Sequence, residues 1–396
     1  MSDRGPVLEE LVAEAAARAG AAPEVLPPTF VSTLGLLLAS CRGTARLTPT
    51  GWSVVRRAAL RHLRNLAYLA AHVAAHPEVT AHPLGTPLVV TGMPRTGTTL
   101  LHNLLALDPD HRVLHLWQAL HPVPPGPGGP SPAELRAQAE SWLAAFHRLV
   151  PEFRAIHATT AEGPEECDAL LQNTFASQHF DDMFDARDYA AWLATAGLHD
   201  EYRHYARQLR VLSAGVGAPG AGGAGGPAAG RTWALKSPSH LGHLDALLDA
   251  LPGATVALCH REPRQAVASY ASLILAVRRP HTDAVDPAVL GAQALSRSAT
   301  AMTRALAVRA VRPERFVDVS YPELVRAPIG AVRRLYGDLG RALDPRVEDR
   351  MGRWLAANPQ HKHGPHRYAL EDFGLDPERV DEAFAAYRVG FGAATR

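Results

Sequence analysis

Apolar and polar positions follow two periods along the chain. Short runs of apolar and β-branched residues, typical of buried strands, occur at 89–91, 232–236, 254–260 and 315–319. Between and around them, apolar residues recur every three or four positions, which predicts helices at 98–107, 133–150, 164–180, 198–212, 240–250, 263–278 and 286–310. Strands that alternate with helices form a parallel sheet covered on both faces. The pattern therefore predicts an α/β fold with a doubly wound parallel sheet and large helical additions.

The same pattern divides the chain into layers of one domain, 1–396. Residues 1–86 are rich in Ala, Leu and Arg at helical spacing and predict a helical N-terminal layer. Residues 87–375 hold every predicted strand and form the α/β core, and 376–396 predict a C-terminal helix. The Gly/Ala-rich segment 213–230 has no core-forming side chains, so we expect a flexible surface insertion.

Basic residues gather on one face of the N-terminal helical layer. They are Arg56, Arg57, Arg61 and Arg64. A charged face on a surface helix usually lies in water, so we interpret it as solvated rather than as a binding patch.

Composition excludes several classes of protein. With 47% hydrophobic residues, 20% charged residues and a formal net charge of +1, the chain lacks the basic excess of a nucleic-acid binder. No apolar run approaches the roughly 20 residues of a membrane span, and the first residues do not resemble a secretory signal. The three cysteines are widely spaced, which argues against disulfides or a zinc site and favours a cytoplasmic protein. The sequence does not indicate an oligomeric state.

A glycine-rich loop follows the first predicted strand. Gly92 and Gly97, with Thr99 two positions later, reproduce the phosphate-loop spacing G-x-x-x-x-G-K-[ST], except that Thr98 stands in place of the lysine. A strand–loop–helix turn of this kind presents backbone N–H groups and a helix N-terminus to an anion. The cation is Arg95, inside the loop. The sequence thus predicts a sheet of P-loop NTPase-like type, although a glycine-rich turn needed only for close packing gives the same pattern.

Two further strands end in candidate anion ligands. The second predicted strand ends at Lys236 and the third at His260-Arg261, with Ser269 about two helical turns beyond Arg261. The carboxyl ends of parallel strands meet at one edge, so these groups should share one cleft with the loop. No strand ends in the aspartate that holds Mg²⁺ in triphosphate enzymes, and Asp318 is the one acidic residue inside a predicted strand. We therefore expect no metal.

Together, these residues resemble those of the sulfotransferases that use 3′-phosphoadenosine-5′-phosphosulfate (PAPS), especially the bacterial branch with long helical insertions. The core Pro-Arg-Thr-Gly-Thr-Thr at 94–99 matches the loop that binds the 5′-phosphosulfate in that family, and the resemblance extends over about 85–375. It implies that Arg95, Thr96, Gly97, Thr98 and Thr99 bind the 5′ end of PAPS. The implied cosubstrate is PAPS, and the implied acceptor is a hydroxyl of a small molecule.

The resemblance extends to the other cofactor positions. Arg261 and Ser269 have the spacing of the residues that bind the 3′-phosphate, and Lys236 stands where a lysine assists sulfuryl transfer. Tyr321 belongs to a segment similar to the one near the adenosine. A divergent version of the basic loop that closes on the 3′-phosphate contains Lys362, His363 and Gly364.

The general base is left open by the sequence. Pro238 occupies the position at which the cytosolic animal members carry a histidine. His115 is the first candidate, because histidine titrates in the right range. The alternatives are Glu166, Glu162 and His240.

Two other functions fit the loop alone. One is a P-loop kinase or nucleotide hydrolase, which the missing lysine opposes, and the other is a non-catalytic nucleotide-binding protein. The acceptor is not readable from the sequence. Aromatic residues that are candidates for an apolar acceptor pocket are Trp117, Phe175, Phe180, Phe184 and Trp192.

Overall fold

The computed structural model describes residues 5–124, 129–153, 159–215, 231–359 and 368–395. Within these ranges the sheet has five strands in the order β2-β3-β1-β4-β5, and every neighbouring pair is parallel. The strands are β1 (Leu88–Gly92), β2 (His111–Arg112), β3 (Thr232–Lys236), β4 (Thr255–His260) and β5 (Phe316–Ser320). The predicted doubly wound parallel sheet is confirmed. The strand β2 was not predicted, because two residues are too short to show a period.

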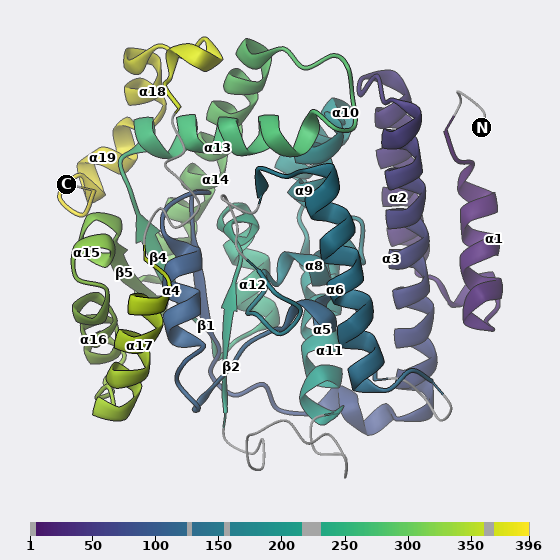
Figure 1. Ribbon diagram of the computed structural model, residues 1–396, viewed down its shortest axis with the longest axis horizontal. Helices are drawn as coiled ribbons and strands as arrows, with labels where there is room; N and C mark the ends of the chain where they lie inside the picture. The colour runs from purple at the N-terminus through teal and green to yellow at the C-terminus, as the bar shows by residue number, and fades with distance from the viewer. Residues whose placement is uncertain (1–4, 125–128, 154–158, 216–230, 360–367, 396) are drawn as a thin grey trace.

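Helices cover both faces of the sheet (Figure 1). Alternate residues of β1 point to opposite faces: Leu88 and Val90 pack with Leu101 of α4 (Thr98–Leu105), whereas Val89 joins the larger core. That larger core includes apolar residues of the N-terminal helices and of α13 (Pro263–Arg278). Burial of both faces explains why β1, β3 and β4 read as apolar runs.

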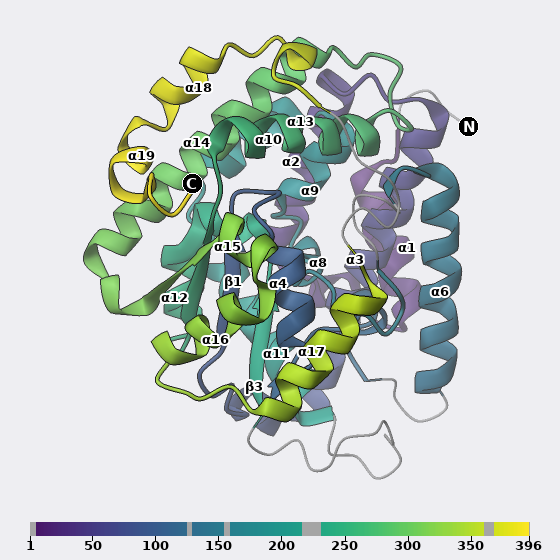
Figure 2. The same ribbon diagram turned by 60° about the vertical axis from the view of Figure 1, so that its left-hand side comes forward.

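The N-terminal helices lie together on one side of the molecule, opposite α15 to α17 (Figure 1). They are α1 (Leu8–Ala19), α2 (Pro28–Gly43) and α3 (Pro49–Ala75). The longest, α3, begins where Thr48 caps the helix by accepting a hydrogen bond from the Gly51 N–H (3.1 Å) and Pro49 occupies the first helical position. Figure 2 shows α6 beside this group.

The remaining helices of the described residues follow in chain order. They are α5 (Leu116–Leu120), α6 (Pro132–Leu149), α8 (Asp168–Gln172), α9 (Gln178–Phe184), α10 (Arg187–Thr195), α11 (His199–Gly215), α12 (Leu244–Ala250), α14 (Pro287–Val311), α15 (Tyr321–Arg326), α16 (Pro328–Asp338), α17 (Pro345–Ala357), α18 (Pro377–Ala383) and α19 (Ala385–Phe391). None of these described helices is long and apolar enough to cross a membrane.

Three helix predictions were wrong in their extent. The helix predicted over 240–250 is α12 from Leu244 onward, after a 3₁₀ helix at Pro238–His243. The single helix predicted over 164–180 is two short helices, α8 and α9, because Phe175 adopts a left-handed conformation (φ 60°) between them. The C-terminal helix predicted over 376–396 is also two, α18 and α19, which meet at Phe384. Most of the predicted insertion 213–230 lies outside the described residues.

Candidate functional site

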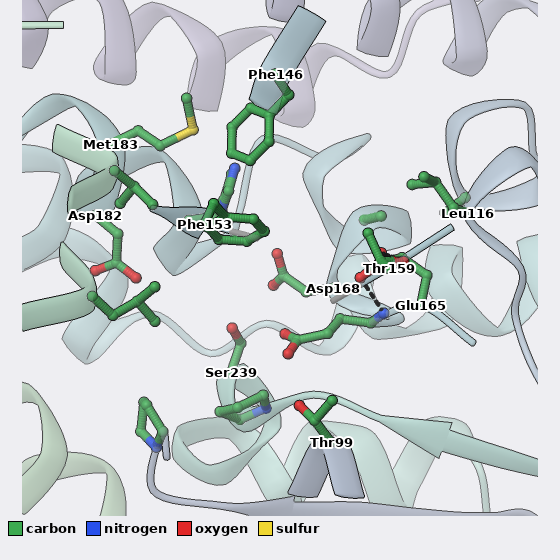
Figure 3. Close-up of a pocket in the computed structure, with 18 of the residues that line it drawn as sticks. Thr99, Leu116, Phe146, Phe153, Thr159, Glu165, Asp168, Asp182, Met183 and Ser239 are labelled. Carbon is green, nitrogen blue, oxygen red and sulfur yellow. Dashed lines mark hydrogen bonds between the residues drawn. The ribbon is translucent and has the colours of Figure 1, made fainter. Parts of the chain in front are cut away.

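A cavity of about 1020 Å³ opens at the carboxyl edge of the sheet. The loop after β1, the start of α4 and the segments after β3 and β4 line one part of it, and α3, α6 and α9 line another. Because β1 lies between β3 and β4, the loop after β1 occupies the crevice where the order of the strands reverses, which is where ligands bind in open α/β sheets. Figure 3 shows Thr99 and Ser239 on one side of the cavity and Phe146 and Phe153 on the other.

The loop after β1 has the backbone of an anion site. Arg95 (φ 70°) and Gly97 (φ 86°) are both left-handed, which turns the chain sharply into α4. Gly97 is the N-cap residue of α4 and has no side chain to cap the first turn. The first N–H groups of the helix are therefore suited to an anion. Thr96 is buried and donates its hydroxyl hydrogen to the Met93 carbonyl (2.7 Å), so its side chain braces the loop.

Gly97 gives a test of this loop geometry. A Cβ at Gly97 would lie 2.8 Å from Cδ2 of Tyr321, and the positive φ strains any other residue. We expect Gly97→Ala to lower the free energy of unfolding by about 1–2 kcal/mol in chemical denaturation. Gly337→Ala is the control, because a Cβ there meets nothing within 4 Å. Equal stability of the two variants would contradict the strained geometry.

Arg95 and Arg261 come together beside the loop. Nη1 of Arg261 donates to the Arg95 carbonyl (2.6 Å), and Nε of Arg95 donates to Oγ of Ser269 (3.3 Å). The Arg261 guanidinium lies over the Tyr321 ring, 4.2 Å from its centroid, and contacts the Tyr368 hydroxyl (3.4 Å). The predicted set Arg95, Arg261, Ser269 and Tyr321 is thus one cluster, in which two guanidinium groups and a hydroxyl can bind an anion.

Lys236 and Glu166 form an ion pair at the end of β3. Nζ of Lys236 lies 2.5 Å from Oε1 of Glu166 and 3.4 Å from Oγ1 of Thr99. Only 1% of the Lys236 side chain is exposed, so its charge acts in a poorly solvated environment. Backbone contacts hold the glutamate there, because the Cys167 N–H donates to the Lys236 carbonyl (3.0 Å). Glu165 and Glu166 thus precede α8, whereas the helix predicted from residue 164 would have placed them in its first turn.

The other candidates for the general base lie away from the cavity lining. Nδ1 of His115 contacts the Glu162 carbonyl (2.7 Å), and burial lowers the pKa of this histidine. The Glu162 side chain pairs with Arg136. His240 is completely buried, where Tyr202 contacts its Nδ1 (2.8 Å) and burial lowers its pKa to about 3. The geometry favours Glu166, which does line the cavity.

Sequence reasoning missed several titratable residues of the cavity, among them Asp168 and His179. Burial raises the pKa of Asp168, an effect that His179 partly offsets, and burial lowers the pKa of His179. The Asp168 carboxylate accepts hydrogen bonds from Ser177 Oγ (2.7 Å) and Gln172 (3.1 Å). Asp168 belongs to an acidic stretch visible in the sequence, but nothing in the sequence distinguishes His179 from a core histidine.

The basic face of α3 was interpreted wrongly in part. Arg57, Arg61 and Arg64 line the cavity, whereas Arg56 pairs with Glu14. The predicted aromatic wall is also partly different. Phe180 and Phe184 line the cavity together with Phe146 and Phe153 of the α6 region, and Trp117, Phe175 and Trp192 are not among the lining residues.

The predicted basic loop and the acidic residue of the last strand do not belong to the described part of the site. Lys362, His363 and Gly364 lie outside the described residues. Asp318 accepts a hydrogen bond from Nε2 of His260 (2.8 Å) and pairs with Arg309, so this carboxylate is engaged on β5. Within the described ranges, no three His, Cys, Asp or Glu side chains are grouped as metal ligands.

Comparison with known proteins gives concordant matches. The family model described as the sulfotransferase family matches residues 87–345. The crystal structure of sulfotransferase STF1 from Mycobacterium tuberculosis H37Rv is 29% identical over 97% of this chain and 100% of its own, with a TM-score of 0.82. That of sulfotransferase STF9 from Mycobacterium avium is 29% identical over 99% of this chain and 98% of its own, with a TM-score of 0.83. A search of proteins with curated function found no match.

Proposed function

The chain belongs to the sulfotransferase family and is a transferase, and from this premise we propose that it moves the sulfuryl group of PAPS to a hydroxyl of a small-molecule acceptor. The observation that carries the proposal is that the anion-binding loop and Arg261 line one cavity, with the buried Lys236 in contact with the lining residues Glu166 and Thr99. A donor with a 5′-phosphosulfate and a separate 3′-phosphate needs cationic groups of this kind at two points.

The residues fit the donor at both points. We assign the 5′-phosphosulfate to Arg95, the amides of Gly97, Thr98 and Thr99, and the start of α4, where no capping side chain competes. We assign the 3′-phosphate to Arg261 and Ser269, which share contacts with Arg95. Tyr321 lies against Arg261, and we assign it to the border of the adenosine.

Sulfuryl transfer requires that the donor and the acceptor are held in line and that positive charge stabilises the leaving group. PAPS supplies a sulfuryl group whose sulfur forms a bond to the acceptor oxygen as its bond to the bridging phosphate oxygen breaks, which leaves adenosine 3′,5′-bisphosphate. Lys236 is placed to stabilise the charge on the bridging oxygen in a poorly solvated site. Glu166, held against Lys236, is placed to take the hydroxyl proton, because carboxylates act as general bases when held within hydrogen-bond reach. We propose that no metal takes part.

Arg261 gives a test of the 3′-phosphate site. We expect Arg261→Ala to weaken binding of adenosine 3′,5′-bisphosphate in calorimetry by roughly 1.5–3 kcal/mol, the value of hydrogen bonds to charged groups. Adenosine 5′-monophosphate lacks the 3′-phosphate, so its affinity should change little. Arg264→Ala is the matched control, since Arg264 pairs with Asp381 outside the cavity lining. If Arg261→Ala bound the bisphosphate with unchanged affinity, the 3′-phosphate would have to bind somewhere other than Arg261.

A transfer assay tests the function itself. The protein, sulfur-labelled PAPS and a panel of alcohols and phenols are incubated with a chelator, and label and nucleotide are followed together. We expect label to move to an acceptor with release of equimolar adenosine 3′,5′-bisphosphate. Binding of PAPS without acceptor-dependent release would indicate a nucleotide-binding protein instead. Mg²⁺-dependent turnover of ATP would indicate a kinase or hydrolase.

A further inference from the structure

Three arginines of α3 face the cavity. Arg57, Arg61 and Arg64 are spaced at i, i+4 and i+7, which places them on one side of the helix, and all three line the cavity. The Arg61 guanidinium lies over the ring of Trp142 on α6, 5.7 Å from its centroid. In Figure 3, Phe146, one turn from Trp142 on α6, lies across the cavity from Thr99. Arg61, which contacts Trp142, therefore lies on the side of the cavity that α6 lines.

Charges elsewhere in the cavity have partners within the protein. Glu166 pairs with Lys236, and Asp182 pairs with Arg297 (2.8 Å) and accepts from Tyr270 (2.8 Å). Asp168 accepts hydrogen bonds from Ser177 and Gln172. Each of these three carboxylates thus has at least one partner inside the fold.

Arg61 and Arg64 differ from those groups. No carboxylate among the described residues lies within ion-pair distance of either guanidinium. Nη2 of Arg61 contacts Nε2 of His62 (3.2 Å), and Nε of Arg64 is buried without a hydrogen-bond partner. Burial, followed by repulsion from Arg64, lowers the pKa of Arg61 to about 10. The residues outside the described ranges contain one acidic side chain, Asp3. Both side chains are half-buried, and a half-buried guanidinium that faces no carboxylate is suited to an anion from outside the chain.

Apolar side chains line much of the same cavity. Phe146 and Phe153 pack edge to face, with ring centroids 4.9 Å apart, and Phe180, Leu273 and Val277 also line the cavity. Such a wall suits an apolar ligand chain.

From this arrangement we propose that the acceptor is an elongated amphiphile whose carboxylate, sulfate or phosphate group binds Arg61 and Arg64, with Arg57 at the edge of the site. Its apolar chain lies along the aromatic wall, and its hydroxyl lies at Lys236 and Glu166. The position of the hydroxyl rests on the proposed sulfotransferase reaction, whereas the anion site does not.

Two ligands of equal length test the anion site in the unmodified protein. Binding of ω-hydroxydodecanoic acid and of the matching α,ω-diol is measured by calorimetry, with adenosine 3′,5′-bisphosphate present to occupy Arg95 and Arg261. We expect the acid to bind about tenfold more tightly or better, the factor for one charge-assisted hydrogen bond. Equal affinity, or tighter binding of the diol, would overturn the proposal.

Variants locate the effect on α3. Arg61→Gln/Arg64→Gln should remove the preference for the acid and leave the affinity for the diol within about twofold, because glutamine keeps most of the side-chain bulk. Arg56→Gln on the same helix is the control, since Arg56 pairs with Glu14 and should keep the preference. A preference that persists in the double variant would overturn the site. Failure of the protein to bind adenosine 3′,5′-bisphosphate would count against the sulfotransferase mechanism, and the ligand pair is then compared without it.

Discussion

Glu166→Gln should lower kcat by about 10²–10⁴-fold while PAPS binding stays within a few-fold. Glutamine keeps the shape of the side chain and its contact with Lys236, but it cannot accept the acceptor's proton. The measurement is steady-state transfer from PAPS to whichever acceptor the transfer assay identifies, with donor affinity measured separately by calorimetry.

Glu162→Gln is the matched control for that experiment. Glu162 precedes the same segment but pairs with Arg136 and does not line the cavity, so its variant should keep wild-type kcat. A normal kcat in Glu166→Gln, or an equal loss in Glu162→Gln, would show that Glu166 is not the base and would return His115 to consideration.

Lys236→Ala is expected to lower kcat by about 10²–10³-fold, with a smaller effect on the affinity for PAPS. The lysine stabilises charge that develops on the bridging oxygen in the transition state, and its burial strengthens that effect. An equal loss of kcat and of donor affinity would instead assign Lys236 to ground-state binding.

The two variants also test each other. Because Lys236 and Glu166 are in contact, the double variant should lose less activity than the product of the two single losses. Thermal unfolding of each variant checks that the fold is intact, since Lys236→Ala leaves the Glu166 carboxylate without its partner.

The sheet was predictable because its strands are local in sequence. Three of the four predicted strands, β1, β3 and β4, are buried on both faces and read as apolar runs, and β5 at the sheet edge is partly exposed. The helices between the strands fix parallel pairing. The strand β2 was not predicted because it has only two residues and pairs with β3 alone. The interruption between α8 and α9 at Phe175 was not predicted because no sequence pattern marks an aromatic residue in a left-handed conformation.

The anion-binding cluster was predictable because each residue follows the end of a strand. Arg95, Lys236 and Arg261 had to meet once the strands were parallel. Glu166 could not be ranked above His115 in the same way. Its position depends on a hydrogen bond from Cys167 to Lys236, across 69 residues of chain, which local patterns do not encode.

The arginines of α3 show a similar limit. The helical period places Arg57, Arg61 and Arg64 on one side, but it says nothing about what that side faces. A basic helix face is usually exposed to solvent, so we expected these arginines to be solvated. Because α6 packs beside α3, they line the cavity instead.

A competition between two nucleotides tests the donor site most directly. Calorimetric titration compares adenosine 3′,5′-bisphosphate with adenosine 5′-diphosphate in the presence of Mg²⁺. A loop with Thr98 in place of the lysine, and Arg261 and Ser269 beside it, predicts that the bisphosphate binds about tenfold more tightly or better, because only it carries a 3′-phosphate. Equal or tighter binding of the diphosphate would contradict a PAPS site and favour an enzyme that uses a nucleoside triphosphate.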